Sequence, residues 1–148
     1  TLLVSVVIWK NDENYNIHAI SKNISKILGF SQENFINKKT IYSDLIHPDD
    51  LKRVISEIKN NVSEKKLEFT PEPYRIRNNK GIYKWIKMDI TVIYDKGEVS
   101  HFIGYISDCT LEKENLIEKE KEDGSKYLGY LLIILMKVQN QQEKYMRL

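Results

Sequence analysis

The spacing of apolar residues changes twice along the chain, and each stretch predicts a different kind of element. Residues 2–9 are apolar except for Ser5, and half of them are β-branched. Turn-forming residues follow at 11–14, and residues 17–20 are again mainly apolar. This pattern predicts a β-hairpin at the start of the chain. From residue 24 the apolar positions recur at helical spacing, and after residue 66 they alternate with polar positions, as strands do.

Short helices are predicted between residues 22 and 60. The first ends at Gly29, a residue suited to a C-terminal cap, and Ser31 can cap the next one. The clearest helix begins at Pro48, and the two aspartates after this proline complement the positive end of the helix dipole. Its apolar stripe follows the spacing i, i+3, i+4, i+7 and consists of Leu51, Val54, Ile55 and Ile58.

Three further strands are predicted at 67–77, 82–94 and 99–108, joined by turns that contain Asn, Asp and Gly. Pro71 and Pro73 lie in the first of these strands, and neither can donate a backbone hydrogen bond. This strand therefore belongs at an edge of the sheet. The order of the elements predicts an α+β domain around one antiparallel sheet.

Alternation along the last two strands separates two sheet faces. One face carries Ile86, Met88, Ile90 and Val92 with Phe102, Gly104 and Ile106. The opposite face also carries apolar residues, namely Trp85, Ile103 and Tyr105. We expect the helices to cover the first face and a partner to cover the second.

The net charge and the cysteine count limit which partners and which cellular compartment are expected. A net charge of +2 gives no broad basic surface, so nucleic acid is not expected as a partner. Cys109 is the single cysteine, which excludes an internal disulfide and suits a reducing compartment. We expect a cytoplasmic protein, and leave open whether the parent protein is attached to a membrane. The start at Thr1, without an initiator Met, is interpreted as a piece of a longer protein.

Four stretches carry a resemblance to a known family. They are ILGFSQENF (27–35), DLIHPDD (44–50), YRIRNNKGIYKWI (74–86) and GYISDCT (104–110). In this order and spacing they resemble PAS sensor domains, especially the common bacterial subtype, over residues 6–113. The resemblance implies a PAS domain at 1–110 with a five-stranded antiparallel sheet in spatial order 2-1-5-4-3, with short helices on one face. It also implies that the chain is a fragment of a signalling protein.

The resemblance assigns a relay role to Asp108 and Thr110, where the last strand passes into a signalling helix. Both side chains are short and can bond to neighbouring backbone groups or cap the following helix. A cap between strand and helix without any relay role is the alternative, and the two interpretations are compatible.

PAS pockets lie between the helices and the inner sheet face. The residues expected to line such a pocket are Ile41, Leu45, Val54, Ile58, Met88, Ile90, Phe102, Gly104 and Ile106. A solid core without a ligand is the alternative. Tyr74 and Arg75 could anchor a polar ligand or could be exposed on an edge strand.

The cofactor is unknown. Residues 22–60 contain no cysteine, so the flavin photochemistry of light sensors is not expected. None of His18, His47 and His101 is placed as a haem ligand, and a helix-start role accounts for His47. No metal-ligand spacing is present.

The tail divides at Asp123-Gly124-Ser125, which is expected to interrupt a charged signalling helix or linker at 111–126. A C-terminal helix, amphipathic to apolar, is predicted at 127–148. Its stretch of a dozen mainly apolar residues, 127–138, is too short to span a bilayer. Leu128, Leu131 and Leu135 have coiled-coil spacing. Because the helix is apolar nearly all round, we expect it to pack against another chain or against the outer sheet face.

These observations support a sensory module that responds to a small ligand or partner and acts through its C-terminal helix on an output domain of the same polypeptide. The alternative is a ligand-free dimerisation module of a histidine kinase or a GGDEF diguanylate cyclase. A homodimer is expected in either case. The chain itself is not expected to be an enzyme, because no nucleophile–base arrangement or phosphate-binding loop is present.

Overall fold

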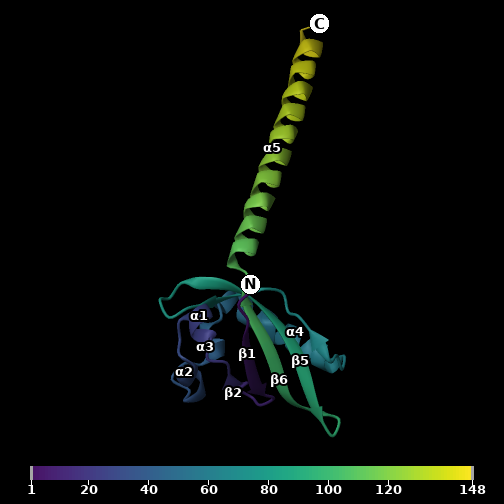
Figure 1. The fold of residues 1–148 in the computed structure, drawn as a ribbon. Helices are drawn as coiled ribbons and strands as arrows, with labels where there is room; N and C mark the ends of the chain where they lie inside the picture. Colours follow the sequence, from purple (N-terminus) through teal and green to yellow (C-terminus); the bar gives the residue numbers. More distant parts are fainter. Residues whose placement is uncertain (1, 148) are drawn as a thin grey trace. The chain divides into compact units, whose positions relative to one another are not determined.

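The computed structural model describes residues 2–147, and the chain divides after Thr110 into two compact units. The first unit is an α+β domain, and the second is a single long helix (Figure 1). The α+β class and the antiparallel sheet predicted from the sequence are confirmed.

The sheet contains six antiparallel strands. Its order is β2-β1-β6-β5-β3, and β4 also pairs with β5. The strands are β1 (Ser5–Lys10), β2 (Ile17–Ile20), β3 (Glu68–Phe69), β4 (Tyr74–Arg77), β5 (Tyr83–Asp95) and β6 (Glu98–Asp108). The first and last strands of the domain are thus neighbours at its centre.

The predicted strand at 67–77 is instead two short strands, β3 and β4. Pro71 and Pro73 lie between them and remove two donors that a continuous ladder would need. Among the described strands, both pair only with β5, so the predicted edge position is correct. Outside the strands, β4 has one further bridge, from Ile76 to Ile46. Apart from this division, the strand order is the one expected.

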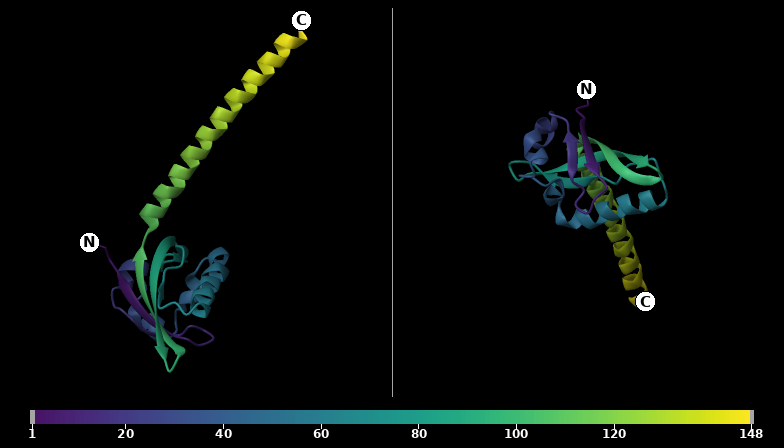
Figure 2. Two further views of the ribbon diagram at one scale, coloured as in Figure 1. Left: turned by 90° about the vertical axis from the view of Figure 1, so that its right-hand side faces the viewer. Right: turned by 90° about the horizontal axis from the view of Figure 1, so that it is seen from below.

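Among the described residues, four helices contribute side chains to the core on one face of the sheet. They are α1 (Ile24–Leu28), α2 (Gln32–Ile36), α3 (Tyr42–Leu45) and α4 (Pro48–Ser63). The longest of them, α4, lies beside the strands in the left view of Figure 2. Gly29 ends α1 with a φ of 76°, a conformation that glycine adopts without steric cost. His47 caps α4, because its Nδ1 accepts a hydrogen bond of 3.1 Å from the Asp49 backbone. The predicted helix-start role of this histidine is confirmed.

The core lies between these helices and the inner face of the sheet. The β5 residues predicted for this face, which are Ile86, Met88, Ile90 and Val92, are all buried. Phe102 and Ile106 of β6 are also buried, and Val54 and Ile58 reach the core from α4. The alternation and the helical stripe therefore identified the inner face correctly.

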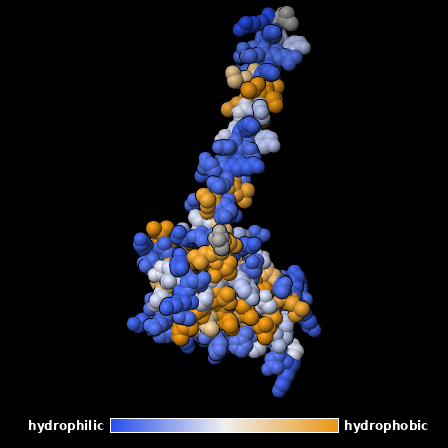
Figure 3. Space-filling view, viewed as in Figure 1, coloured by the Kyte–Doolittle hydropathy of each residue, from blue (hydrophilic) through white to orange (hydrophobic). Residues whose placement is uncertain are grey.

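The outer face of the sheet carries an apolar patch over β1 and β6, visible in Figure 3. Its centre is formed by two cross-strand pairs, Val6 with Tyr105 and Ile8 with Ile103. The Tyr105 side chain is 41% exposed, and the other three are half-buried. We refer to these four residues as the outer-face patch.

The second unit is one helix, α5 (Thr110–Met146), without the predicted interruption at Asp123-Gly124-Ser125. A glycine inside a helix costs only about 1 kcal/mol relative to alanine, and the helix-forming residues around Gly124 outweigh this cost. None of the side chains described in α5 is buried. In the described part of the chain, no helix has the length and apolar character required to cross a bilayer.

Candidate functional site

An apolar cavity of about 80 Å³ lies between the inner sheet face, α3 and α4. Three residues predicted for a pocket, Val54, Ile58 and Met88, line this cavity. The remaining lining residues are Val7, Trp9, Tyr15, Ile17, Tyr42, Ser43, Ile46, Leu51 and Ile55. About half of the lining residues are buried and the others half-buried, so the cavity reaches the surface.

The other predicted pocket residues lie elsewhere. Leu45, Ile90, Phe102 and Ile106 are buried in the core but do not line the cavity. Ile41 is 49% exposed, because it precedes α3 in extended conformation instead of facing the sheet. The pocket prediction for Ile41 is therefore not supported by its position.

Gly104 leaves room that other side chains fill. A Cβ atom at this position would lie 2.7 Å from Trp9 Cζ3 and 2.8 Å from Met88 Sδ. The Trp9 indole stacks on the Phe102 ring with centroids 5.3 Å apart. The absence of a side chain at Gly104, which was predicted to line a ligand pocket, thus admits the indole of a tryptophan from the same sheet.

The first hairpin supplies four lining residues that the sequence argument missed. Val7 and Trp9 lie on the same, buried side of β1. Tyr15 lies in the turn that follows, and Ile17 is the first residue of β2. Alternation along residues 5–10 was the signal that could have identified the first pair. Tyr15 gave no such signal, because its position depends on a turn with a positive φ of 48°.

Two tyrosines form a hydrogen bond in the core beside the cavity. The hydroxyls of Tyr42 and Tyr74 are 2.6 Å apart, and Tyr74 is completely buried. Burial raises the pKa of both phenols, so both remain uncharged at neutral pH. The prediction that Tyr74 could be exposed at the edge is wrong, since this residue faces inward from β4.

Arg75 is engaged in an ion pair rather than free to anchor a ligand. Its Nε and Nη2 atoms donate to the two carboxylate oxygens of Asp50, each at 2.9 Å. The Arg75 backbone N–H also donates to Asp50, and the guanidinium lies 5.4 Å from the centre of the Trp85 ring. These bonds hold the pKa of Asp50 at about 2 and join the start of α4 to β4.

At the end of β6 three residues form a connected set, which we call the exit network: Trp85, Asp108 and Thr110. The Thr110 hydroxyl donates to Asp108 Oδ1 at 2.6 Å and accepts from the Trp85 backbone N–H at 2.9 Å. The Thr110 backbone N–H also donates to Asp108 Oδ1, at 2.9 Å. The Cys109 N–H bonds to the Trp85 carbonyl, so β5 is tied to the first residues of α5.

The predicted interface residues are accessible to different degrees. Trp85 and Ile103 are half-buried, and Tyr105 belongs to the outer-face patch. On α5, more than half of each predicted leucine side chain is exposed; these are Leu128, Leu131 and Leu135. The two surfaces lie in different units of the chain.

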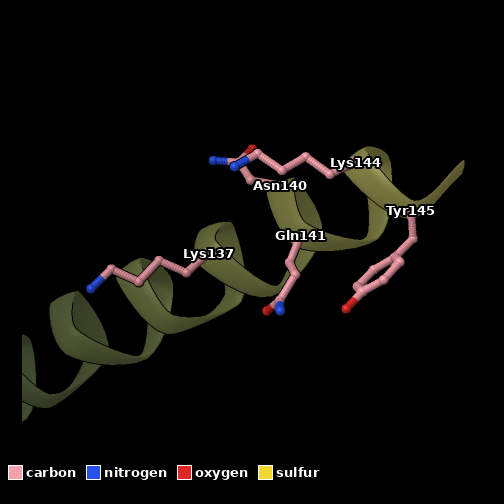
Figure 4. A pocket seen from close by; sticks show the side chains of 5 residues that line it. All are labelled: Lys137, Asn140, Gln141, Lys144 and Tyr145. Carbon is pink, nitrogen blue, oxygen red and sulfur yellow. The ribbon is translucent and has the colours of Figure 1, made fainter. Parts of the chain in front are cut away.

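A shallow hollow near the end of α5 offers no comparable site. Its five side chains all project from the last turns of this helix, as Figure 4 shows; they are Lys137, Asn140, Gln141, Lys144 and Tyr145. They line an open helix surface without a second wall. Within residues 2–147, no group of three His, Cys, Asp or Glu side chains is arranged to hold a metal ion.

Known proteins resemble this chain in sequence. The family model described as "PAS fold" matches residues 17–106. A methyl sulfide methyltransferase-associated sensor from Methanosarcina acetivorans is 34% identical over 113 residues, or 75% of this chain. The chain spans only 11% of the length of that sensor.

Solved structures share the fold. The N-terminal domain of a diguanylate cyclase with a PAS/PAC sensor from Marinobacter aquaeolei has a TM-score of 0.62 at 24% identity, covering 75% of this chain and 99% of that one. A sensory box histidine kinase/response regulator from Burkholderia thailandensis also has a TM-score of 0.62, at 23% identity, covering 81% and 88% of the two chains. With more than half of its residues matched by the family model, the chain belongs to the PAS fold family.

Proposed function

We propose that the chain is a sensory module in which a small ligand occupies the cavity, and that the exit network passes the resulting change to α5. An output domain of the parent protein, a histidine kinase or a diguanylate cyclase, would receive the change. The relatives described above, which are a sensor and PAS regions of these two enzyme classes, favour this kind of parent.

One observation carries the proposal: a single strand joins the cavity to the exit network. Met88 of β5 lines the cavity, and Trp85 lies three residues earlier on the same strand. The register pairs Met88 with Ile106 and Ile86 with Asp108, so the two adjacent strands connect both sites by backbone hydrogen bonds. A shift of β5 at the cavity therefore changes the position of the donor that binds Thr110.

Filling the cavity by mutation imitates ligand binding and tests this proposal. Val54→Phe adds a ring inside the cavity, and we expect the amide hydrogen exchange of residues 110–116 to change at least threefold. In the Thr110→Val background, which removes the hydroxyl of the exit network, the same substitution should leave that exchange unchanged. Such a difference measures coupling between the two sites directly.

Two matched substitutions control the experiment. Val62→Phe adds the same ring to α4 at a half-buried position outside the cavity. Thr91→Val removes a hydroxyl from the outer face of β5, away from the exit network. Neither should alter exchange at 110–116. Equal effects of Val54→Phe with and without the Thr110 hydroxyl would contradict the relay.

A second function, constitutive dimerisation, is favoured by the exposed apolar residues of α5. Ten of the twelve residues from Tyr127 to Val138 are large apolar side chains that are at least 48% exposed. A helix with so much exposed apolar surface gains stability by association. Dimerisation alone predicts no response of α5 to changes in the cavity, and so the exchange experiment separates the two functions.

A further inference from the structure

The chemistry of the cavity wall restricts what can bind there. None of the described residues that line the cavity is charged, and the cavity walls are almost entirely carbon. The hydroxyl of Tyr42 already shares a hydrogen bond with Tyr74 at 2.6 Å. A carboxylate, phosphate or ammonium group in this position would lose its hydration without gaining a partner of opposite charge, which is strongly unfavourable.

The size of the cavity is a second restriction. Its volume of about 80 Å³ is far below the roughly 300–1,000 Å³ of sites that hold cofactors and drug-sized ligands. A water molecule occupies about 30 Å³ in the liquid, so the space would hold nearly three waters. Covalently bonded atoms lie closer together than separate water molecules, and the space therefore accommodates about three to five non-hydrogen atoms of one small molecule. Trp9, which packs over Gly104 and stacks on Phe102, fills the part of the inner sheet face that a larger ligand would require.

From these two restrictions we propose that the ligand is a small, uncharged, apolar molecule of about three to five non-hydrogen atoms. This inference rests on the proposed function, because it names the ligand class of the same cavity. At the limit of about 1.5 kcal/mol per non-hydrogen atom, ligands of this size reach dissociation constants of about 3 µM to 0.5 mM at best. The module would then respond to a volatile or membrane-permeant compound at high concentration rather than to a tightly held cofactor.

Nuclear magnetic resonance of the purified chain tests the ligand class. Xenon and cyclopentane are the apolar probes, acetate is a charged probe of similar size, and indole is an apolar probe that is too large. We expect saturable shifts at the methyl groups of Val54, Ile58 and Met88 with xenon and cyclopentane. Acetate and indole should bind at least tenfold more weakly.

Substitutions confirm where the probes bind. Val54→Phe should abolish the response to xenon and cyclopentane, whereas Val62→Phe on the same helix should retain it. If Val54→Phe proves unfolded by circular dichroism, Ser43→Leu fills the cavity from its rim instead. Retained binding in a folded, filled variant would overturn the proposal, as would the absence of binding by both apolar probes.

The remaining outcomes separate the ligand class from the proposed function. Stronger binding of acetate or indole at the same methyl groups would overturn the ligand class. If the backbone amides of the exit network also responded to that probe, the sensory function would stand. Binding of cyclopentane with no response of the exit network would support the ligand class and contradict the relay.

Discussion

At the scale of single residues, the ion pair of Asp50 and Arg75 links helix α4 to strand β4 through three hydrogen bonds. Asp50 is 7% exposed, yet three donors from Arg75 satisfy its carboxylate. An ionised carboxylate persists at such a buried site only when it is paired and hydrogen-bonded. The lowered pKa of Asp50, about 2, is a consequence of these bonds.

This pair predicts how stability depends on acid. The pKa of Asp50 is about 2 in the folded protein and about 3.9 in an unfolded chain. Its contribution, about 2.6 kcal/mol in total, is therefore complete above about pH 5, and about 2 kcal/mol of it is lost when the pH falls to 2. Urea unfolding at pH 5 and at pH 2 measures this loss. Between these two pH values, the unfolding free energy of Asp50→Asn should fall by about 2 kcal/mol less than that of wild type.

Asp49→Asn is the matched control, because the neighbouring Asp49 side chain is 78% exposed. It loses a favourable interaction with the helix dipole and an exposed contact of 3.9 Å with His47. Both are weak, so its unfolding free energy at neutral pH should decrease by less than about 1 kcal/mol. Asp50→Asn should be destabilised by about 3 kcal/mol at neutral pH, because it leaves Arg75 without a counter-charge. Identical pH profiles for wild type and Asp50→Asn would refute this assignment.

At the scale of elements, local sequence patterns predicted the helices and strands that depend only on residues close together in the sequence. Two predictions of this kind are confirmed: the buried face of β5 and β6, and the capped start of α4. Both features depend on neighbours a few residues away. The division between β3 and β4 depends on how two prolines compete with pairing to β5. The continuity of α5 through Gly124 depends on a sum over many helix-forming residues. Neither the division between β3 and β4 nor the continuity of α5 can be predicted from one residue alone.

The exposed apolar part of α5 predicts self-association. Leu131→Asp with Leu135→Asp places two charges on the predicted seam, and these charges would be buried without partners in a dimer. Sedimentation equilibrium should show the dimer dissociation constant rising at least tenfold. Leu116→Asp, a similarly exposed leucine outside the apolar stretch, should have little effect. A wild-type chain that remains monomeric at high micromolar concentration would contradict this prediction.

At the scale of the whole molecule, the fold could be predicted better than the site. Strand order and the inner face follow from patterning and from the resemblance to PAS domains. The cavity depends on how particular side chains share the space, and only three of the nine predicted residues line it. Trp9 fills the space over Gly104, and Tyr15 reaches the cavity through a turn. Such packing depends on contacts between distant segments, which one sequence does not reveal.

The central claim is that occupancy of the cavity changes the start of α5 through β5 and the exit network. Amide hydrogen exchange of residues 110–116, measured with and without saturating cyclopentane, tests this claim most directly. We predict at least a threefold change in wild type and none in Thr110→Val. Exchange that changes only around Val54, Ile58 and Met88, with residues 110–116 unaffected in wild type, would contradict the account.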